Sequence, residues 1–353
     1  MVPGFGALTL GLAAASLAVS AAGVWYSIRL AQRVGVVDVP NERSSHAVPT
    51  PRMGGVPMVG AAVAMFGCWF FLAAGEALSI RGLPSVFLFA LVMSVIGFWD
   101  DFSGLSPLFR FLVQFVAAVS LLWSFAVPIP EMALAGAALP KAVLVLAGAI
   151  WSVWMLNLYN FMDGIDGIAG GEAALASSFF FLVFAWYGET GWAAANLFIA
   201  AASMGFLVHN WPPARVFMGD AGSGFLGAFY GMQSVVAALA TPVPYLVLVL
   251  PFANFILDTT FTLLRRVVRG EKWYEAHRSH FYQRMTDLGM SHAKVTGLEM
   301  ASVAVSCLAA VFVLASSFVW KIVAVAVVLG GFVSAGVLVS LKEKLHPQKQ
   351  GRS

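Results

Sequence analysis

Charged residues are scarce in this chain of 353 residues. Asp, Glu, Lys and Arg together make up 10% of it, while hydrophobic residues make up 60%. Soluble domains usually carry about 25% charged residues, and a soluble fold cannot bury so much apolar surface. The formal net charge is only +3, so no nucleic-acid partner is expected. The composition predicts a polytopic membrane protein.

Cysteine is also rare, and Cys68 and Cys307 both lie inside apolar runs. Their positions match neither a disulfide framework nor a metal-binding spacing, so we interpret both thiols as packing residues. The sequence shows no internal repeat, no low-complexity segment and no soluble domain. Residues 1–353 are therefore expected to form a single integral membrane domain.

Hydrophobic runs of membrane-spanning length are abundant. A helix needs about 20 apolar residues to cross a bilayer. The first run is too long for the apolar part of a signal peptide and has no basic segment before it, so we interpret it as a helix as well. We predict an all-α protein with about eleven transmembrane helices, over approximately 4–28, 56–75, 83–99, 109–127, 139–159, 173–188, 192–209, 222–240, 243–263, 300–317 and 319–340.

The distribution of Lys and Arg predicts the orientation in the membrane. If the N-terminus lies outside, only Arg81, Lys141 and Lys321 fall on the outer side, and the other 17 of the 20 basic residues fall inside. Cytoplasmic loops carry such an excess of basic residues. We therefore expect an outside N-terminus, a cytoplasmic C-terminus and an active site on the cytoplasmic loops.

Five inner segments carry unusual clusters of polar residues, whereas the outer loops are short and uniform. They read NERSSHAVPTPRMGG (41–55), DDFSGLSPLFR (100–110), NFMDGIDGIAGG (160–171), NWPPARVFMGDAGSG (210–224) and RRVVRGEKWYEAHRSHFYQR (265–284). Five aspartates lie at or just beyond predicted helix ends, namely Asp100, Asp101, Asp163, Asp166 and Asp220. Ionisable groups so close to hydrocarbon are expensive and are functional candidates by default.

Five carboxylates on one face indicate a bound cation. Converging carboxylates repel one another, and oxygen ligands without His–Cys spacing favour Mg²⁺, with Mn²⁺ as the alternative. Mg²⁺ usually takes one or two carboxylates and completes its shell with water and substrate phosphates, so some of the five must do other work. Adjacent helical residues point about 100° apart. We therefore expect either Asp100 or Asp101 to face the site and the other to cap or support it.

Polar residues also recur every three positions after the fifth predicted helix. If that helix continues through Asn157, Asn160, Asp163 and Asp166, each side chain neighbours the next. The glycines of the same segment allow close approach of a ligand or a sharp exit of the chain, but tight helix packing explains them equally well.

Basic residues accompany the acids in these inner segments. The candidates are Arg52, Arg110, and the His277, Arg278 and His280 of HRSH. Arginine binds phosphate through its planar fork. The excess of basic residues on the cytoplasmic side is enough to explain the arginines within 265–269, without a role in ligand binding. A zinc site at the histidine pair is the weaker reading, because neither a cysteine nor a third histidine accompanies it.

Acids that hold Mg²⁺, basic groups that hold phosphates and glycine-rich turns together indicate phosphoryl transfer. At the cytoplasmic surface of a bilayer, such a site can take a soluble nucleotide-linked donor and a lipid phosphate as acceptor. The sequence contains neither a P-loop nor a kinase signature, which disfavours transfer from ATP.

Five motifs in order carry a family resemblance. PTPRMGG, DD, NFMDGIDG, VFMGDAGS and HRSH, within about residues 40–285, resemble the cytoplasmic blocks of the polyprenyl-phosphate N-acetylhexosamine-1-phosphate transferases, glycosyltransferase family 4. The bacterial initiators of O-antigen and other surface polysaccharides are the most similar. The resemblance implies that a UDP-N-acetylhexosamine donates its sugar 1-phosphate to undecaprenyl phosphate, with release of UMP. It also implies a multi-pass protein of the bacterial inner (plasma) membrane.

The same resemblance suggests roles for individual residues. Asn160 and Asp220 resemble the Mg²⁺ ligands. The expected catalytic residues are Asp100, Asp101, Asp163, Asp166, His277 and His280. The expected substrate-binding residues are Arg52, Arg110, Asn157 and Arg278. A lipid phosphate has a second pKa of about 6 and scarcely needs a base, which favours a positioning role for Asp100; roles as base or nucleophile stay open.

Two departures and several alternatives limit the reading. HRSH has two histidines where the peptidoglycan enzyme has three, and Arg110 stands where relatives commonly have Lys. The sequence defines neither the sugar nor the oligomeric state, so a homodimer stays open. An ion-coupled transporter with a cytoplasmic-side cation site is the alternative class, but transporters usually hold such acids near the midplane, often with an internal repeat. The sequence lacks the motif of the CDP-alcohol transferases, which disfavours that class. An inactive homologue is disfavoured because all five aspartates are present.

Overall fold

The computed structural model describes residues 6–35, 37–38, 40, 48–73, 80–126, 133–134, 137–138, 140–272, 277–315 and 317–345. Its elements are α1 (Ala7–Val34), β1 (Val37–Asp38), β2 (Thr50–Pro51), α2 (Gly55–Leu72), α3 (Leu83–Ser103), α4 (Pro107–Ala126), β3 (Ala133–Leu134), β4 (Ala137–Ala138), α5 (Lys141–Met162), α6 (Ile168–Trp186), α7 (Thr190–Asn210), α8 (Asp220–Ala240), α9 (Tyr245–Val249), η1 (Leu250–Phe252), α10 (Ala253–Val268), α11 (Phe281–Asp287), α12 (His292–Ala315) and α13 (Phe318–Leu345).

The protein is an all-α polytopic membrane protein, as the sequence predicts. Eleven helical spans in the described part of the chain are long and apolar enough to cross a membrane. The four described strands are two residues long each and form two antiparallel pairs, with Val37 opposite Pro51 and Ala133 opposite Ala138. The predicted helix ends at residues 4, 75, 127 and 139 lie outside the described residues.

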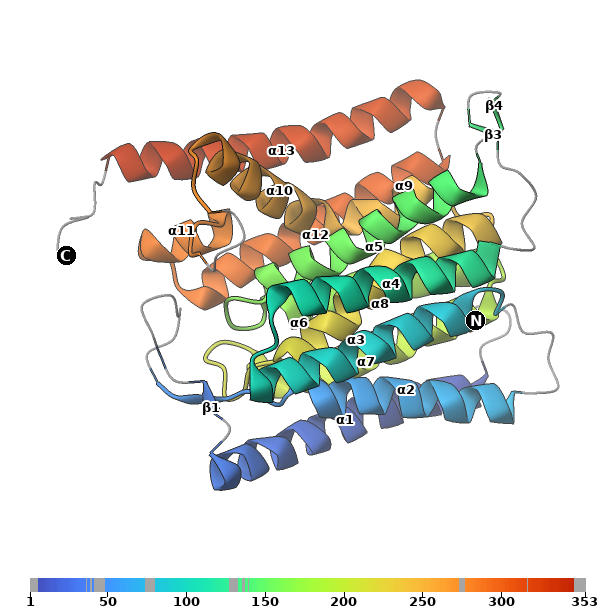
Figure 1. Cartoon of the computed structure of the whole chain (residues 1–353), viewed down its shortest axis with the longest axis horizontal. Helices are drawn as coiled ribbons and strands as arrows, with labels where there is room; N and C mark the ends of the chain where they lie inside the picture. Colours follow the sequence, from blue (N-terminus) through green and yellow to red (C-terminus); the bar gives the residue numbers. More distant parts are fainter. Residues whose placement is uncertain are drawn as a thin grey trace.

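Two of the predicted spans differ most from the structure, while α1 and α13 extend past their predicted ends at 28 and 340 to Val34 and Leu345, and α6 begins at Ile168 before its predicted start at 173. The ninth is broken into α9, η1 and α10, because Pro251 in η1 lacks the backbone N–H that a continuous helix needs. After this break α10 diverges from its neighbours towards α13 (Figure 1). The tenth begins at His292 and not near residue 300, because its first turns are polar and hydropathy detects only the apolar part.

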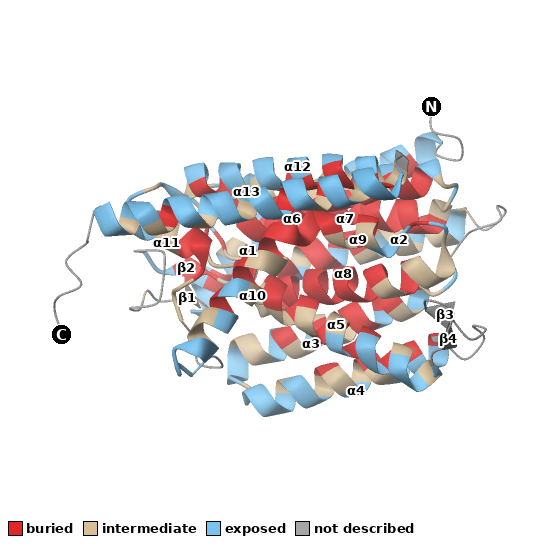
Figure 2. Ribbon diagram, turned by 90° about the horizontal axis from the view of Figure 1, so that it is seen from above, coloured by how far each residue is buried: buried red, intermediate tan, exposed pale blue. Residues whose placement is uncertain are grey.

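The helices α6, α7 and α8 form the centre of the bundle, where most residues are buried (Figure 2). Glycines allow α8 to approach its neighbours closely. A Cβ on Gly97 of α3 would lie 2.2 Å from the Asp220 carbonyl oxygen, and one on Gly227 would lie 2.8 Å from Leu156 Cα of α5. These contacts bring the start of α8 against the last turns of α3 and α5.

The polar segments meet at one end of this bundle. β1, α11 and the connections that follow α3, α5 and α7 all lie there, on the left in Figure 1. This common end agrees with their expected position on one side of the membrane.

Candidate active site

The paired aspartates near the end of α3 have different surroundings. Asp101 accepts hydrogen bonds from the backbone N–H groups of Asp220 (3.2 Å) and Ala221 (3.4 Å). A carboxylate at a helix N-terminus satisfies free N–H groups and interacts favourably with the helix dipole. Asp100 instead lines a cavity and accepts a 2.6 Å hydrogen bond from the N–H of Leu105. The predicted division, with one residue facing the site and one supporting it, is confirmed for the geometry.

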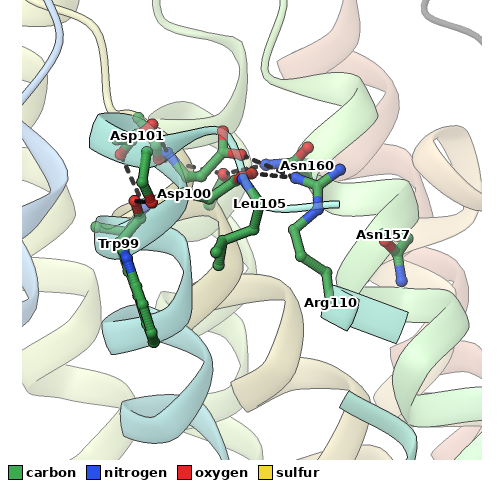
Figure 3. Close-up of polar contacts among 12 residues, drawn as sticks. Trp99, Asp100, Asp101, Leu105, Arg110, Asn157 and Asn160 are labelled. Atoms are coloured by element: carbon green, nitrogen blue, oxygen red, sulfur yellow. Dashed lines mark hydrogen bonds and ion pairs between the residues drawn. The ribbon is translucent and has the colours of Figure 1, made fainter. Parts of the chain in front are cut away.

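Two arginines hold Asp220 from opposite sides. Arg52 Nη2 lies 2.7 Å from Asp220 Oδ1, and its Nε lies 3.2 Å from Asp101 Oδ1. Arg110 Nη1 lies 3.5 Å from Asp220 Oδ2 and forms an ion pair with Asp100 (Figure 3). Three carboxylates and two guanidinium groups thus form one network.

Arg52 is placed by backbone pairing between two of the predicted motifs. The N–H of Phe217 donates to the Pro51 carbonyl (2.8 Å), and Gly55 N–H donates to the Met218 carbonyl (2.8 Å). A Cβ on Gly55 would lie 2.5 Å from the Cα of Gly222. The glycines of PTPRMGG and VFMGDAGS therefore allow the two segments to lie in direct backbone contact, which brings Arg52 next to Asp220.

The last turns of α5 supply two amides. Asn160 donates through Nδ2 to Ser223 Oγ (2.8 Å), and Asn157 donates to Gln114 Oε1 (2.9 Å). Both asparagines, labelled with Arg110 in Figure 3, line the same cavity as that arginine. Gln114 is a cavity residue that sequence reasoning missed. The sequence signal that could have indicated it is an amide side chain within an apolar helix.

A cavity of about 480 Å³ has part of this polar network, Asp100, Arg110 and Asp220, at one end. α3, α4, α5, α8 and α10 line it. Its polar groups are Asp100, Arg110, Gln114, Asn157, Asn160 and Asp220. The rest of its lining is apolar and includes Phe111, Phe115, Trp154 and Leu263. The cavity therefore combines a charged end with a long hydrophobic wall inside the membrane-spanning segments.

The helix does not continue through Asp163 and Asp166. α5 ends at Met162, and Gly167 has a φ of 77° ahead of α6. Asp163 caps α5; burial raises its pKa to about 8, against an opposing effect of Arg52, and nearby Asp220, Asp101 and Asp166 raise it further. The condition for a regular spacing of the four side chains, a helix that continues through Asp166, is therefore not met, because the chain turns after Met162.

Asp166 connects separate parts of the chain. It accepts from the N–H of Ala214 (3.0 Å), lies 3.2 Å from His292 Nδ1, and its carbonyl accepts from Thr296 Oγ1. Burial alone would raise its pKa, but the His292 and Ala214 hydrogen bonds outweigh burial and hold the pKa below its ordinary value. Asp166 is not among the described residues that line the cavity. Its contact with Ala214 orders the 211–215 segment.

The HRSH segment is held by Asp258, which sequence reasoning missed. This buried carboxylate accepts from the N–H groups of Phe281 (2.9 Å) and Tyr282 (3.3 Å), and lies 3.3 Å from His280 Nδ1. The sequence signal for it was the one acidic residue in the largely apolar run 251–264, since intramembrane acids are functional candidates. Tyr282 Oη then donates to the Phe161 carbonyl (3.0 Å), which connects the segment to α5.

The other members of HRSH have contacts of their own. Arg278 Nη2 lies 2.8 Å from Asp287 Oδ1. The rings of His277 and His280 are tilted relative to each other, with centres 4.9 Å apart. Burial, followed by His280, Arg266 and Arg265, lowers the pKa of His277 to about 4, so it is neutral at pH 7. In the described part of the chain, no ion pair joins these residues to the Asp100–Asp220 network.

The oxygen donors fit Mg²⁺ only when a substrate completes the shell. Across the described residues, no cluster of three or more His, Cys, Asp or Glu side chains has a geometry suited to a metal ion. Mg²⁺ usually uses one or two carboxylates together with water and substrate phosphates. Asp220 and the side-chain oxygen Oδ1 of Asn160 provide such a small set. The side-chain Nδ2 of Asn160 donates to Ser223.

The fold and the site define a polytopic membrane protein with a cluster of Asp, Arg and Asn side chains at one end of a largely apolar cavity. The sequence model of Glycosyl transferase family 4 matches residues 83–238, which include α3 through most of α8. The chain is 31% identical over 278 residues to a probable undecaprenyl-phosphate N-acetylglucosaminyl 1-phosphate transferase of Bacillus subtilis, covering 75% of this chain and 73% of the relative.

Two further relatives agree with this match. A decaprenyl-phosphate N-acetylglucosaminephosphotransferase of Mycobacterium tuberculosis is 31% identical over 342 residues, 87% of this chain and 82% of that protein. An undecaprenyl-phosphate alpha-N-acetylglucosaminyl 1-phosphate transferase of Thermotoga maritima is 30% identical over 257 residues, with coverages of 72% and 75%. The chain belongs to glycosyl transferase family 4, the polyprenyl-phosphate N-acetylhexosamine-1-phosphate transferases.

Proposed function

We propose that this protein transfers N-acetylhexosamine 1-phosphate from a UDP-sugar to undecaprenyl phosphate and releases UMP. The observation that carries the proposal is the cavity, whose charged end holds Asp100, Arg110, Asn160 and Asp220 and whose remaining wall is apolar. A lipid phosphate matches both parts: its head group fits the charged end and its chain fits the hydrophobic wall. The names of the three relatives support N-acetylglucosamine as the sugar.

The proposed reaction is a direct displacement at phosphorus. An oxygen of the lipid phosphate forms a bond to the sugar-linked phosphorus of the donor, and the bond from that phosphorus to the bridging oxygen breaks. UMP leaves with the bonding electron pair. Because the lipid phosphate has a second pKa of about 6, it is largely a dianion at pH 7 and gives up no proton when it attacks.

The residues of the charged end have separate tasks in this proposal. Arg110 is held between Asp100 and Asp220, where its guanidinium can bind the incoming lipid phosphate and orient the attacking oxygen. Arg52, on the other side of Asp220, can bind the diphosphate of the donor. Asp100 then acts as a positioning residue for Arg110, and Asp101 fixes the start of α8.

Asp220 and Asn160 would hold Mg²⁺ together with the donor diphosphate. The ion, when bound, supplies positive charge that stabilises the charge developing on the phosphate oxygens. HRSH packs against the segment that follows Asn160, and we place the sugar of the donor beside this contact, near Asp163. Gln114 fixes the amide of Asn157 at the cavity wall.

We also propose that the site faces the cytoplasm and that the protein lies in the inner membrane of a bacterium. The excess of basic residues on the site side supports this orientation. The lipid-linked product would then start a cell-envelope glycan such as an O-antigen.

The test is UMP release by purified protein with undecaprenyl phosphate, Mg²⁺ and a panel of UDP-N-acetylhexosamines. Release is expected with UDP-N-acetylglucosamine, and EDTA should abolish it until Mg²⁺ is added back. Asp220→Asn should lower the rate at least a hundredfold. Glu271→Gln, which removes a carboxylate that pairs with Arg266, is the matched control and should retain the rate. Cation-dependent transport without UMP release would favour the transporter reading.

A further inference from the structure

A second cavity lies on the opposite side of α10 from the 480 Å³ cavity of the candidate active site, which we call the catalytic cavity. It has a volume of about 310 Å³ and lies between α10, α11 and α13. α10 contributes Leu263 to the catalytic cavity and Phe261 to this second one. The other apolar residues of its lining are Phe281, Phe332, Val333, Val337 and Leu341. We call it the α13 groove.

The α13 groove is open to the surroundings of the bundle. Val333 and Val337 are 61% and 51% exposed, and α13 is the least buried of the eleven spans described. Gly336 forms part of the groove, since a Cβ there would lie 3.1 Å from the Phe281 ring. Within a bilayer, an apolar groove on an exposed helix is in contact with lipid chains.

One end of the groove carries excess positive charge. Lys344 lines this end, and Lys342, two positions earlier, is exposed on another side of the same turn of α13. The nearby Arg284 is neutralised by Glu343, with Nε–Oε1 and Nη2–Oε2 distances of 2.7 and 2.6 Å. No ion pair neutralises Lys342 or Lys344 among the residues that the structure describes. Basic residues between helices at the membrane surface bind anionic head groups.

We propose that the α13 groove binds an anionic phospholipid, with one acyl chain against Phe261, Phe332 and Val337 and the phosphate paired with Lys344. A phosphodiester held by charge alone fits this end. The described lining contains no carboxylate and no carboxamide, unlike the end of the catalytic cavity, so it lacks the groups that would orient a reacting phosphate. The occupant is therefore a phospholipid and not the polyprenyl acceptor.

The groove borders the active-site end of the chain through one residue. Phe281 lines it, directly follows His280, and carries Arg284 over its ring at 4.7 Å. A bound acyl chain would therefore contact the helix that Asp258 holds in place. Lipid binding at this position does not depend on the proposed transferase reaction.

Native mass spectrometry of the delipidated full-length protein, titrated with phosphatidylglycerol or phosphatidylcholine, tests the proposal. The wild type should bind phosphatidylglycerol more tightly. Val337→Trp, which fills the groove, should weaken that binding at least tenfold. Val327→Trp, a matched control on the same helix at a position 57% exposed and outside the groove, should bind as the wild type does.

Lys344→Gln tests the head-group contact without disturbing the packing, because the side chain is exposed. One basic residue near a membrane surface contributes enough attraction for an expected loss of about fivefold for phosphatidylglycerol and none for phosphatidylcholine. Equal binding of the two lipids by wild type, or unchanged binding by both Val337→Trp and Lys344→Gln, would overturn the proposal. So would direct binding of undecaprenyl phosphate that is as tight as that of phosphatidylglycerol in the wild type and at least tenfold weaker in Val337→Trp.

Discussion

Asp101 accepts a hydrogen bond from the backbone N–H of Asp220 at 3.2 Å, although 119 positions separate the two residues. The same carboxylate lies 3.2 Å from Arg52 Nε. One side chain therefore fixes the start of α8 and orients an arginine that reaches Asp220. The proposed metal ligand and its neighbouring cation depend on this support.

Asp101→Asn should damage both stability and activity. The amide keeps one acceptor but loses the charge that interacts with the N-terminus of α8 and with Arg52. Loss of an N-terminal cap costs about 0.5–2 kcal/mol, so the melting temperature should fall measurably. UMP release should fall with it, because Asp220 and Arg52 lose their alignment. Unchanged melting and unchanged release would show that the cap is unimportant.

Arg110→Lys should separate charge from geometry. Arg110 contacts Asp100 and Asp220 through Nη1 alone, which leaves the rest of its planar fork for a phosphate, whereas lysine keeps the positive charge but has a single nitrogen. We expect kcat/KM for undecaprenyl phosphate to fall about tenfold, and about a hundredfold or more for Arg110→Ala. Arg81→Ala, at an exposed residue near the start of α3, serves as the control. If Arg110→Ala retained wild-type kcat/KM, Arg110 would have no part in acceptor binding.

Asp258→Asn should loosen the HRSH segment. The carboxylate accepts from the N–H groups of Phe281 and Tyr282 and faces His280, and hydrogen bonds to a charged group contribute about 1.5–3 kcal/mol. Hydrogen exchange of the Phe281 and Tyr282 amides should accelerate at least tenfold, and KM for the UDP-sugar should rise. Glu271→Gln again provides the comparison. Exchange rates equal to those of wild type would mean that other contacts hold the segment.

Gly164→Ala and Tyr282→Phe should show coupling. A Cβ at Gly164 would lie 2.0 Å from Tyr282 Oη and 3.0 Å from its Cζ. The alanine variant should therefore be severely impaired, and adding Tyr282→Phe should restore part of the melting temperature because the clashing oxygen is removed. The phenylalanine variant alone loses only its bond to the Phe161 carbonyl. Strictly additive effects of the two substitutions would argue against this contact.

The raised pKa of Asp163 predicts that, in the absence of metal, the stability of the protein depends on pH. Its pKa is about 8 in the fold because of burial, against 3.8 ordinarily. Between these values the unfolded chain releases a proton that the folded chain retains, so this residue makes stability fall as pH rises from about 4 to 8. In EDTA, the melting temperature of Asp163→Asn relative to wild type should therefore rise over that range and level off above it. A constant difference between the two proteins would contradict the raised pKa.

Much of the architecture follows from the sequence because hydropathy and charge are local properties. The number of spans in the described chain, and the gathering of Asp100, Asp101, Asn160 and Asp220 at one end, agree with the prediction. Helix geometry predicts that only one of Asp100 and Asp101 faces the site, and the structure shows that Asp100 lines the cavity while Asp101 supports α8.

Other features depend on contacts that periodicity cannot show. The break at Pro251 and the turn after Met162 change the direction of the chain, so Asp163 and Asp166 face different neighbours. Asp258 and Gln114 belong to apolar runs, and only the tertiary structure shows that one holds HRSH and the other holds Asn157. The partner of Arg278, Asp287, lies on a short helix that hydropathy does not detect.

The most direct test of the central claim is mass-spectrometric detection of the lipid product after incubation with UDP-N-acetylglucosamine, undecaprenyl phosphate and Mg²⁺. The proposed function predicts undecaprenyl diphosphate N-acetylglucosamine from the wild type and from Glu271→Gln, and none above background from Asp220→Asn. Equal product from Asp220→Asn, or UMP release without any lipid-linked sugar from folded wild-type protein, would contradict it.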